Sequence, residues 1–150
     1  MIPNQGPFPE QQAFTAVFLS WFVAQFVKVL LSGFREKRLN LRWLFDTGGM
    51  PSAHSATVSC LATVVGLYYG FHSVLFLAVL IFTIITMFDA AGVRRNVGRQ
   101  ARILNKVLDE FQERGMVQEQ RLKELLGHTP VEVFAGAFLG IVMGYLFCGK

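Results

Sequence analysis

Long apolar segments alternate with polar stretches along the chain. Residues 13–34, 53–71, 73–91 and 130–148 are mostly apolar and carry few charges. An apolar helix of about 20 residues is long enough to cross a hydrocarbon core roughly 30 Å thick. The pattern therefore predicts an all-α fold, an integral membrane helical bundle with about four transmembrane helices that form a single domain over residues 1–150.

The polar stretch of residues 92–129 contains a pattern of its own. Apolar residues recur in it at helical spacing, which is typical of an amphipathic helix that lies on a membrane or packs over a bundle. We expect this helix to end near Gly115 and a second, shorter helix to follow it. The two apolar stripes consist of Ile103, Leu104, Val107, Leu108 and Phe111, and of Leu122, Leu125 and Leu126.

Composition agrees with a lipid environment, and the placement of charge predicts an orientation. The chain is 53% hydrophobic, against roughly 45–50% in soluble domains. The net charge is +4, but 12 of the 14 Lys and Arg lie within residues 35–42 or 94–123. This distribution follows the positive-inside rule and argues against a nucleic-acid partner. We expect a multi-pass protein of a bacterial inner membrane, with loops 35–52 and 92–129 on the cytoplasmic side.

The last apolar segment carries a stripe of small residues. Gly136, Gly140 and Gly144 are spaced four apart, which places them on one helix face. Such a face lets another helix approach closely in lipid. The stripe fits helix packing within the monomer, which we favour, or a homo-oligomer. A structural or assembly factor built on this stripe is one interpretation of the chain.

Polar residues gather at the ends of the apolar segments, on the face that carries the basic loops. In residues 48–55 the glycines permit unusual backbone angles, and Pro51 and Ser52 suit a helix start. N–H groups at a helix start favour an anion. His54, in the first turn, is suited to give a proton to a leaving oxygen near neutral pH. The alternative is an interfacial histidine that only hydrogen-bonds locally.

A second histidine stands at the start of the last apolar segment. His128 and Glu132 are four residues apart, with Pro130 between them. If Pro130 lies in the first helical turn, the carboxylate can approach the imidazole, set its tautomer and leave the other ring nitrogen nucleophilic. The alternative is a carboxylate that only stabilises a helix N-terminus.

Cations lie near both histidines in this arrangement. Lys28 and Arg35 stand at the end of the first apolar segment, and Arg94 and Arg95 follow the third. Arginine is well shaped to bind phosphate oxygens in pairs. The alternatives are that Lys28 extends to the membrane interface and that the arginines are ordinary flanking charges.

These motifs resemble those of the phosphatidic acid phosphatase type 2 family, which is related to vanadium haloperoxidases, and specifically its small divergent branch of bacterial and plastid membrane proteins. The first family motif, Lys, six residues, Arg and Pro, is matched by Lys28 and Arg35, with Glu in place of Pro. The second, Pro-Ser-Gly-His, is matched by residues 51–54, with Ala in place of Gly. The third has His, three residues and Asp, which His128 and Glu132 match with Glu in place of Asp.

One element of the family pattern is missing from the chain. The third motif normally carries Ser-Arg before its histidine, and Leu122 stands at the Arg position. We expect Arg94 or Arg95 to supply the guanidinium from another loop.

The resemblance implies an in-line phosphoryl transfer from a lipid phosphate. His128 would attack phosphorus to form a phosphohistidine, Glu132 would orient His128, and His54 would protonate the leaving alcohol. The substrate would be a phosphomonoester or diphosphate of a lipid, such as an isoprenoid phosphate or a phosphatidate-like molecule, and the scheme needs no metal or other cofactor. The groups implied to neutralise the phosphoryl oxygens are Lys28, Arg35, the backbone of Ser52, Arg94 and Arg95.

A function of another class fits the same residues. A non-catalytic membrane protein can hold an anionic lipid headgroup in a basic pocket between helices. Phosphate release separates the two interpretations, because only the enzyme releases phosphate.

Overall fold

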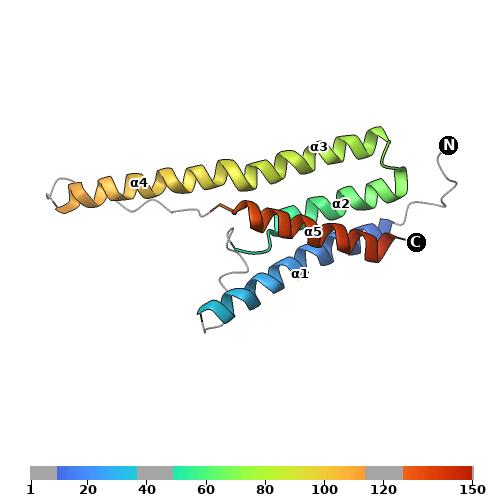
Figure 1. Cartoon of the computed structure of the whole chain (residues 1–150), viewed down its shortest axis with the longest axis horizontal. Helices are drawn as coiled ribbons and strands as arrows, with labels where there is room; N and C mark the ends of the chain where they lie inside the picture. The colour runs from blue at the N-terminus through green and yellow to red at the C-terminus, as the bar shows by residue number, and fades with distance from the viewer. Residues whose placement is uncertain (1–9, 37–48, 114–126, 150) are drawn as a thin grey trace.

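The predicted all-α class is confirmed in the computed structural model, which describes residues 10–36, 49–113 and 127–149 (Figure 1). Helices account for nearly all of these residues, and no strand occurs among them. The elements are α1 (Glu10–Glu36), α2 (Ala53–Tyr69), α3 (Val74–Phe88), the π-helical turn η2 (Asp89–Val93), α4 (Arg94–Glu113) and α5 (Pro130–Cys148).

Helices α1, α2, α3 and α5 run alternately in opposite directions, and α2 lies in the middle (Figure 1). α2 contacts α1, α3 and α5. The connection from α2 to α3 is a tight turn, as expected, in which Gly70 has a φ of 86° and its carbonyl accepts a hydrogen bond of 3.1 Å from the N–H of Ser73. The alternation brings the starts of α2 and α5 to the same end of the bundle.

Three helical segments are long and apolar enough to cross a membrane: Glu10–Phe34, Val74–Phe111 and Pro130–Cys148. Their outward faces carry large apolar side chains, among them Phe14, Phe88 and Phe138, each more than 70% exposed. Such a surface is typical of helices that face lipid. α2 is shorter, at 17 residues, and most of it is buried by its neighbours. The chain is therefore a membrane protein with at least three apolar helices of spanning length.

The glycine stripe of α5 packs against α2 within the monomer, which is the use that we favoured. A Cβ added to Gly140 would lie 2.1 Å from the carbonyl oxygen of Ala56, and one added to Gly136 would lie 2.3 Å from that of Ser52. Only glycine therefore permits this approach of the two backbones. A homo-oligomer through the stripe would need a face that α2 already covers.

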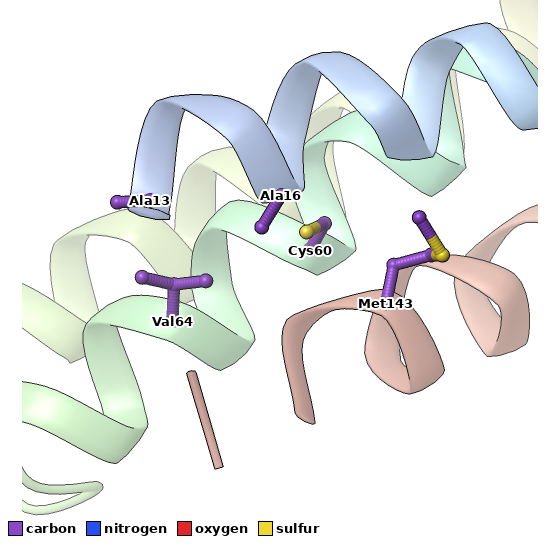
Figure 2. Packing of buried hydrophobic residues seen from close by; sticks show 5 residues of the cluster. All are labelled: Ala13, Ala16, Cys60, Val64 and Met143. Atoms are coloured by element: carbon purple, nitrogen blue, oxygen red, sulfur yellow. The ribbon is translucent and has the colours of Figure 1, made fainter. Parts of the chain in front are cut away.

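Small side chains and cross-helix hydrogen bonds hold the rest of the bundle together. The Ser20 hydroxyl of α1 donates to the carbonyl of Ala56 at 3.1 Å, and the Thr83 hydroxyl of α3 donates to that of Val58 at 3.2 Å. Both acceptors belong to α2, so hydroxyl groups join it to helices on two sides. Figure 2 shows the largest core cluster, in which α1, α2 and α5 meet through Ala13, Ala16, Cys60, Val64 and Met143.

The amphipathic segment forms a helix, but it does not pack over the bundle. α4 follows α3 through η2 and projects beyond the other helices (Figure 1). Its apolar stripe stays open, with Ile103 63% and Phe111 43% exposed. The expected helix end near Gly115 and the shorter helix after it fall on residues outside the described ranges.

Candidate functional site

The start of α2 forms one part of the candidate site. Gly49 has a φ of 95°, a left-handed conformation that favours glycine. Ser52 is the N-cap, as its position after Pro51 predicted, and its hydroxyl accepts a hydrogen bond of 3.4 Å from the N–H of Ser55. α2 then begins at Ala53, which places His54 in the first turn with its side chain exposed.

The start of α5 forms the second part of the candidate site. Thr129 is the N-cap and Pro130 opens the helix, so the expected placement of the proline is confirmed. Thr129 and Glu132 form a reciprocal capping box. The hydroxyl of Thr129 accepts from the N–H of Glu132 at 3.4 Å, and the N–H of Thr129 donates to Oε2 of Glu132 at 2.9 Å. His128 directly precedes this cap, so a rigid helix start positions it.

Two backbone hydrogen bonds join these helix starts to each other and to η2. The N–H of Ser52 donates to the carbonyl of Glu132 at 3.0 Å, and the N–H of His128 donates to the carbonyl of Ala90 in η2 at 3.2 Å. The first bond corrects one expectation. The N–H of Ser52 was expected to neutralise phosphoryl oxygens, but it is engaged in joining α2 to α5.

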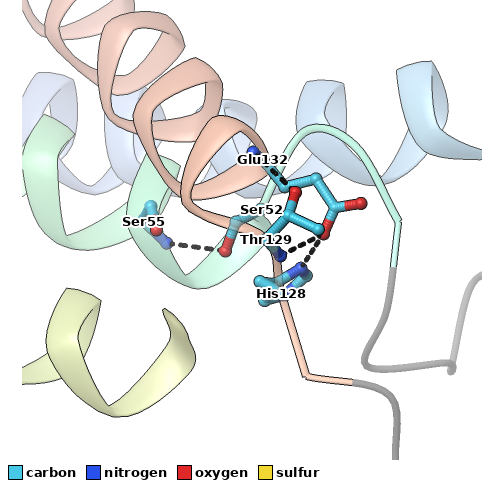
Figure 3. Close-up of polar contacts among 5 residues, drawn as sticks. All are labelled: Ser52, Ser55, His128, Thr129 and Glu132. Atoms are coloured by element: carbon cyan, nitrogen blue, oxygen red, sulfur yellow. Dashed lines mark hydrogen bonds and ion pairs between the residues drawn. The ribbon is translucent and has the colours of Figure 1, made fainter. Parts of the chain in front are cut away.

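The two histidines meet at this end of the bundle. The ring centroids of His54 and His128 are 6.3 Å apart, with the ring planes at 62°. His128 is only 1% exposed, whereas His54 lies at the surface. Nδ1 of His128 lies 3.2 Å from Oε2 of Glu132, which is one fifth exposed (Figure 3). The structure therefore brings together an accessible imidazole and a buried imidazole oriented by a carboxylate.

Lys28 lies against the loop that leads into α2. Its side chain is 2% exposed, and a Cβ added to Gly49 would lie 3.2 Å from its Cγ. The lysine is thus enclosed by protein, so an extension along the lipid surface does not explain it. Glycine suits position 49 for two reasons. It adopts the left-handed backbone conformation without strain, and its lack of a side chain leaves space for the methylene groups of Lys28.

The three arginines of the predicted site are described only as helix positions. Arg35 lies in the last turn of α1, and Arg94 and Arg95 begin α4 directly after η2. Their side chains fall outside what the structure describes. Within the described residues, no group of three His, Cys, Asp or Glu side chains is placed to hold a metal ion.

Sequence reasoning missed Thr129 and the carbonyl of Ala90. The first had a readable signal, because Thr, two residues and Glu before an apolar run is the pattern of a capping box. The second had none, since a backbone carbonyl carries no signature in the residue type.

Comparisons with known proteins agree with the motifs. The model of a family described as the divergent PAP2 family matches residues 9–143. A protein of Bacillus subtilis (strain 168) named "Uncharacterized membrane protein YuiD" is 42% identical over 139 aligned residues, and the match covers 83% of this chain and 88% of that protein. No solved structure matches.

Proposed function

We propose a function from one premise: the chain belongs to the divergent PAP2 family of membrane proteins. The proposed function is hydrolysis of a lipid phosphate, either a phosphomonoester or a diphosphate, at the membrane surface. His128 is the nucleophile, His54 is the general acid and Glu132 orients His128.

A single observation carries this proposal, the meeting of His54 and His128 across 6.3 Å. In-line transfer needs a nucleophile about 3 Å from phosphorus and a proton donor about 3 Å from the leaving oxygen. Two imidazoles this close at one end of the bundle can both reach a phosphoryl group bound beside them. The contact of Nδ1 of His128 with Glu132 supports the direction of attack, because it turns Nε2 into the nucleophilic nitrogen.

In the first step, the lone pair on Nε2 of His128 attacks phosphorus, and the bond from phosphorus to the lipid oxygen breaks. Protonated His54 gives its proton to that oxygen, so the lipid leaves as a neutral alcohol, or as a monophosphate when the substrate is a diphosphate. The Glu132 carboxylate stabilises the positive charge that develops on the His128 ring.

In the second step, water attacks the phosphohistidine and neutral His54 accepts the proton of the water. Inorganic phosphate leaves, and both histidines return to their starting states. Lys28, Arg35, Arg94 and Arg95 neutralise the phosphoryl oxygens, since phosphoryl transfer depends mainly on positioning and charge stabilisation.

We also propose that α2 is a fourth span, which makes the helices alternate across an inner membrane with residues 35–52 and 92–129 in the cytoplasm. The alternating directions of α1, α2, α3 and α5 support this topology. The basic residues of α4 suit the cytoplasmic side of such a membrane. Reporter fusions at residues 115 and 150 test the orientation, and a cytoplasmic signal from residue 150 would contradict it.

The enzymatic test uses purified protein and a panel of phosphatidate, isoprenyl phosphate and isoprenyl diphosphate. We expect phosphate release by the wild type and none by His128→Ala. Release by His54→Ala should fall by about 10²-fold or more, the usual contribution of a general acid. His72→Ala is the matched control, because His72 is exposed in the α2–α3 turn at the other end of the bundle.

Two outcomes contradict the proposal. Release that survives His128→Ala removes the nucleophile. Binding of the same lipids without release by the wild type instead supports the second function, a non-catalytic protein that holds an anionic headgroup between its helices.

A further inference from the structure

One carboxylate oxygen at the start of α5 has two partners. Oε2 of Glu132 accepts the N–H of Thr129 at 2.9 Å and lies 3.2 Å from Nδ1 of His128 (Figure 3). The first contact belongs to the capping box, and the second belongs to the candidate site. The oxygen that completes the cap of α5 is therefore the same oxygen that contacts the imidazole of His128.

This sharing fixes the place of the carboxylate. A Glu side chain has several rotatable bonds, and holding it beside an imidazole costs conformational entropy. The N–H of Thr129 is a backbone donor at a helix N-terminus, where negative charge is favoured. Because an ionised carboxylate only accepts hydrogen bonds, the contact with Oε2 requires a proton on Nδ1 of His128.

We propose that Thr129 is a positioning residue, whose capping box holds Glu132 so that His128 keeps its proton on Nδ1 and its lone pair on Nε2. The catalytic meaning of this tautomer rests on the proposed function, but the tautomer itself does not. The alternative is a cap that stabilises α5 and leaves the imidazole unaffected.

The proposal also gives a reason for Glu in place of Asp at residue 132. The third residue of a capping box must reach back to the N–H of the cap, and Glu or Gln is the residue type that does so. An Asp side chain is one methylene shorter. It reaches less far back toward the N–H of Thr129 while it contacts His128.

The test measures the tautomer of His128 by ¹⁵N NMR of the full-length protein, labelled at histidine, in lipid nanodiscs. Ring ¹⁵N signals distinguish a nitrogen that carries a proton from one that does not, and His128→Ala assigns them. Three variants of Thr129 remove the hydrogen bonds of the cap step by step. Thr129→Ser keeps both capping bonds, Thr129→Ala removes the hydroxyl, and Thr129→Pro also removes the N–H. The φ of −74° at Thr129 suits proline.

We expect Thr129→Ser to keep the wild-type ¹⁵N signals of His128. Thr129→Ala should shift these signals part of the way toward those of the other tautomer. Thr129→Pro should lower the ratio of the Nδ1–H to the Nε2–H tautomer by about tenfold, as loss of one hydrogen bond to a charged group implies. Glu132→Ala sets the limit of the shift. If Thr129→Pro does not fold, Thr129→Ala still tests the direction.

Ser73→Ala is the matched control, because Ser73 caps α3 at the far end of the bundle through a 3.1 Å bond from the N–H of Phe76. It should lower stability and leave the His128 signals unchanged. Wild-type signals in both Thr129→Ala and Thr129→Pro overturn the proposal. A graded tautomer shift in a protein that releases no phosphate contradicts only the proposed function, so the two failures are distinguishable.

Discussion

Gly140→Ala tests the contact between α2 and α5 that positions both histidines. The added Cβ would lie 2.1 Å from the carbonyl oxygen of Ala56 and 2.8 Å from the N of Cys60, where ordinary contact begins at 3.4 Å. Both obstacles are backbone atoms, so no side chain can rotate away and the helices must separate by about 1 Å. Overpacking of this kind costs about 1–3 kcal/mol, and a loss of about 3 kcal/mol lowers the Tm by about 6–12 °C for a chain of this size.

The assay is thermal unfolding in one detergent, with Gly92→Ala as the matched control. Gly92 has nothing within 4 Å of an added Cβ, so the same chemical change should leave the Tm unchanged or raise it slightly. Phosphate release should fall in Gly140→Ala, because separation of the helices weakens the 3.0 Å bond from Ser52 to Glu132. Equal Tm values for the two variants would show that the contact between α2 and α5 tolerates the added methyl group.

Three further experiments probe other parts of the molecule. Ser20→Ala removes one cross-helix hydrogen bond, typically worth about 0.6 kcal/mol in a membrane bundle, so the Tm should fall by about 1–3 °C; no change would show that the bond contributes nothing. Lys28→Met keeps the packing on Gly49 but removes the charge, so phosphate release should fall by about tenfold to a hundredfold while the Tm holds or rises; unchanged release would remove Lys28 from the site. Gly49→Ala and Gly70→Ala both place a side chain at positive φ and should each cost about 1–2 kcal/mol in unfolding experiments. Of the two, Gly49→Ala should also weaken release, because Gly49 lies against Lys28 and Gly70 has nothing within 4 Å of an added Cβ.

The sequence alone predicted the features that depend on local pattern. The apolar segment 130–148 coincides with α5, and Ser52 before Ala53 marks the start of α2, because caps and prolines act on their immediate neighbours. The approach of His54 to His128 followed from alternating helices, which bring the starts of the second and last apolar segments to one end.

Features set by packing could not be predicted in the same way. Periodicity identified the apolar stripe of α4 but carries no information on what covers it, and the helix continues from η2 instead of folding over the bundle. Likewise, an N-cap residue such as Ser52 predicts an N–H that is available to an anion, but in the structure this N–H donates to the carbonyl of Glu132. Which acceptor binds such an N–H depends on segments that are distant in the sequence and meet only in the folded protein.

Transfer of the phosphoryl group from the lipid to His128 can be followed directly with a radioactive label. Wild-type protein is mixed with a ³²P-labelled lipid phosphate that it hydrolyses and is quenched in alkali, in which phosphohistidine survives. Peptide mapping then locates the label. We expect the label on His128, where acid removes it, and no label in His128→Ala. Release of phosphate with label on any other residue, or with no label on the protein under rapid quench, would contradict this expectation.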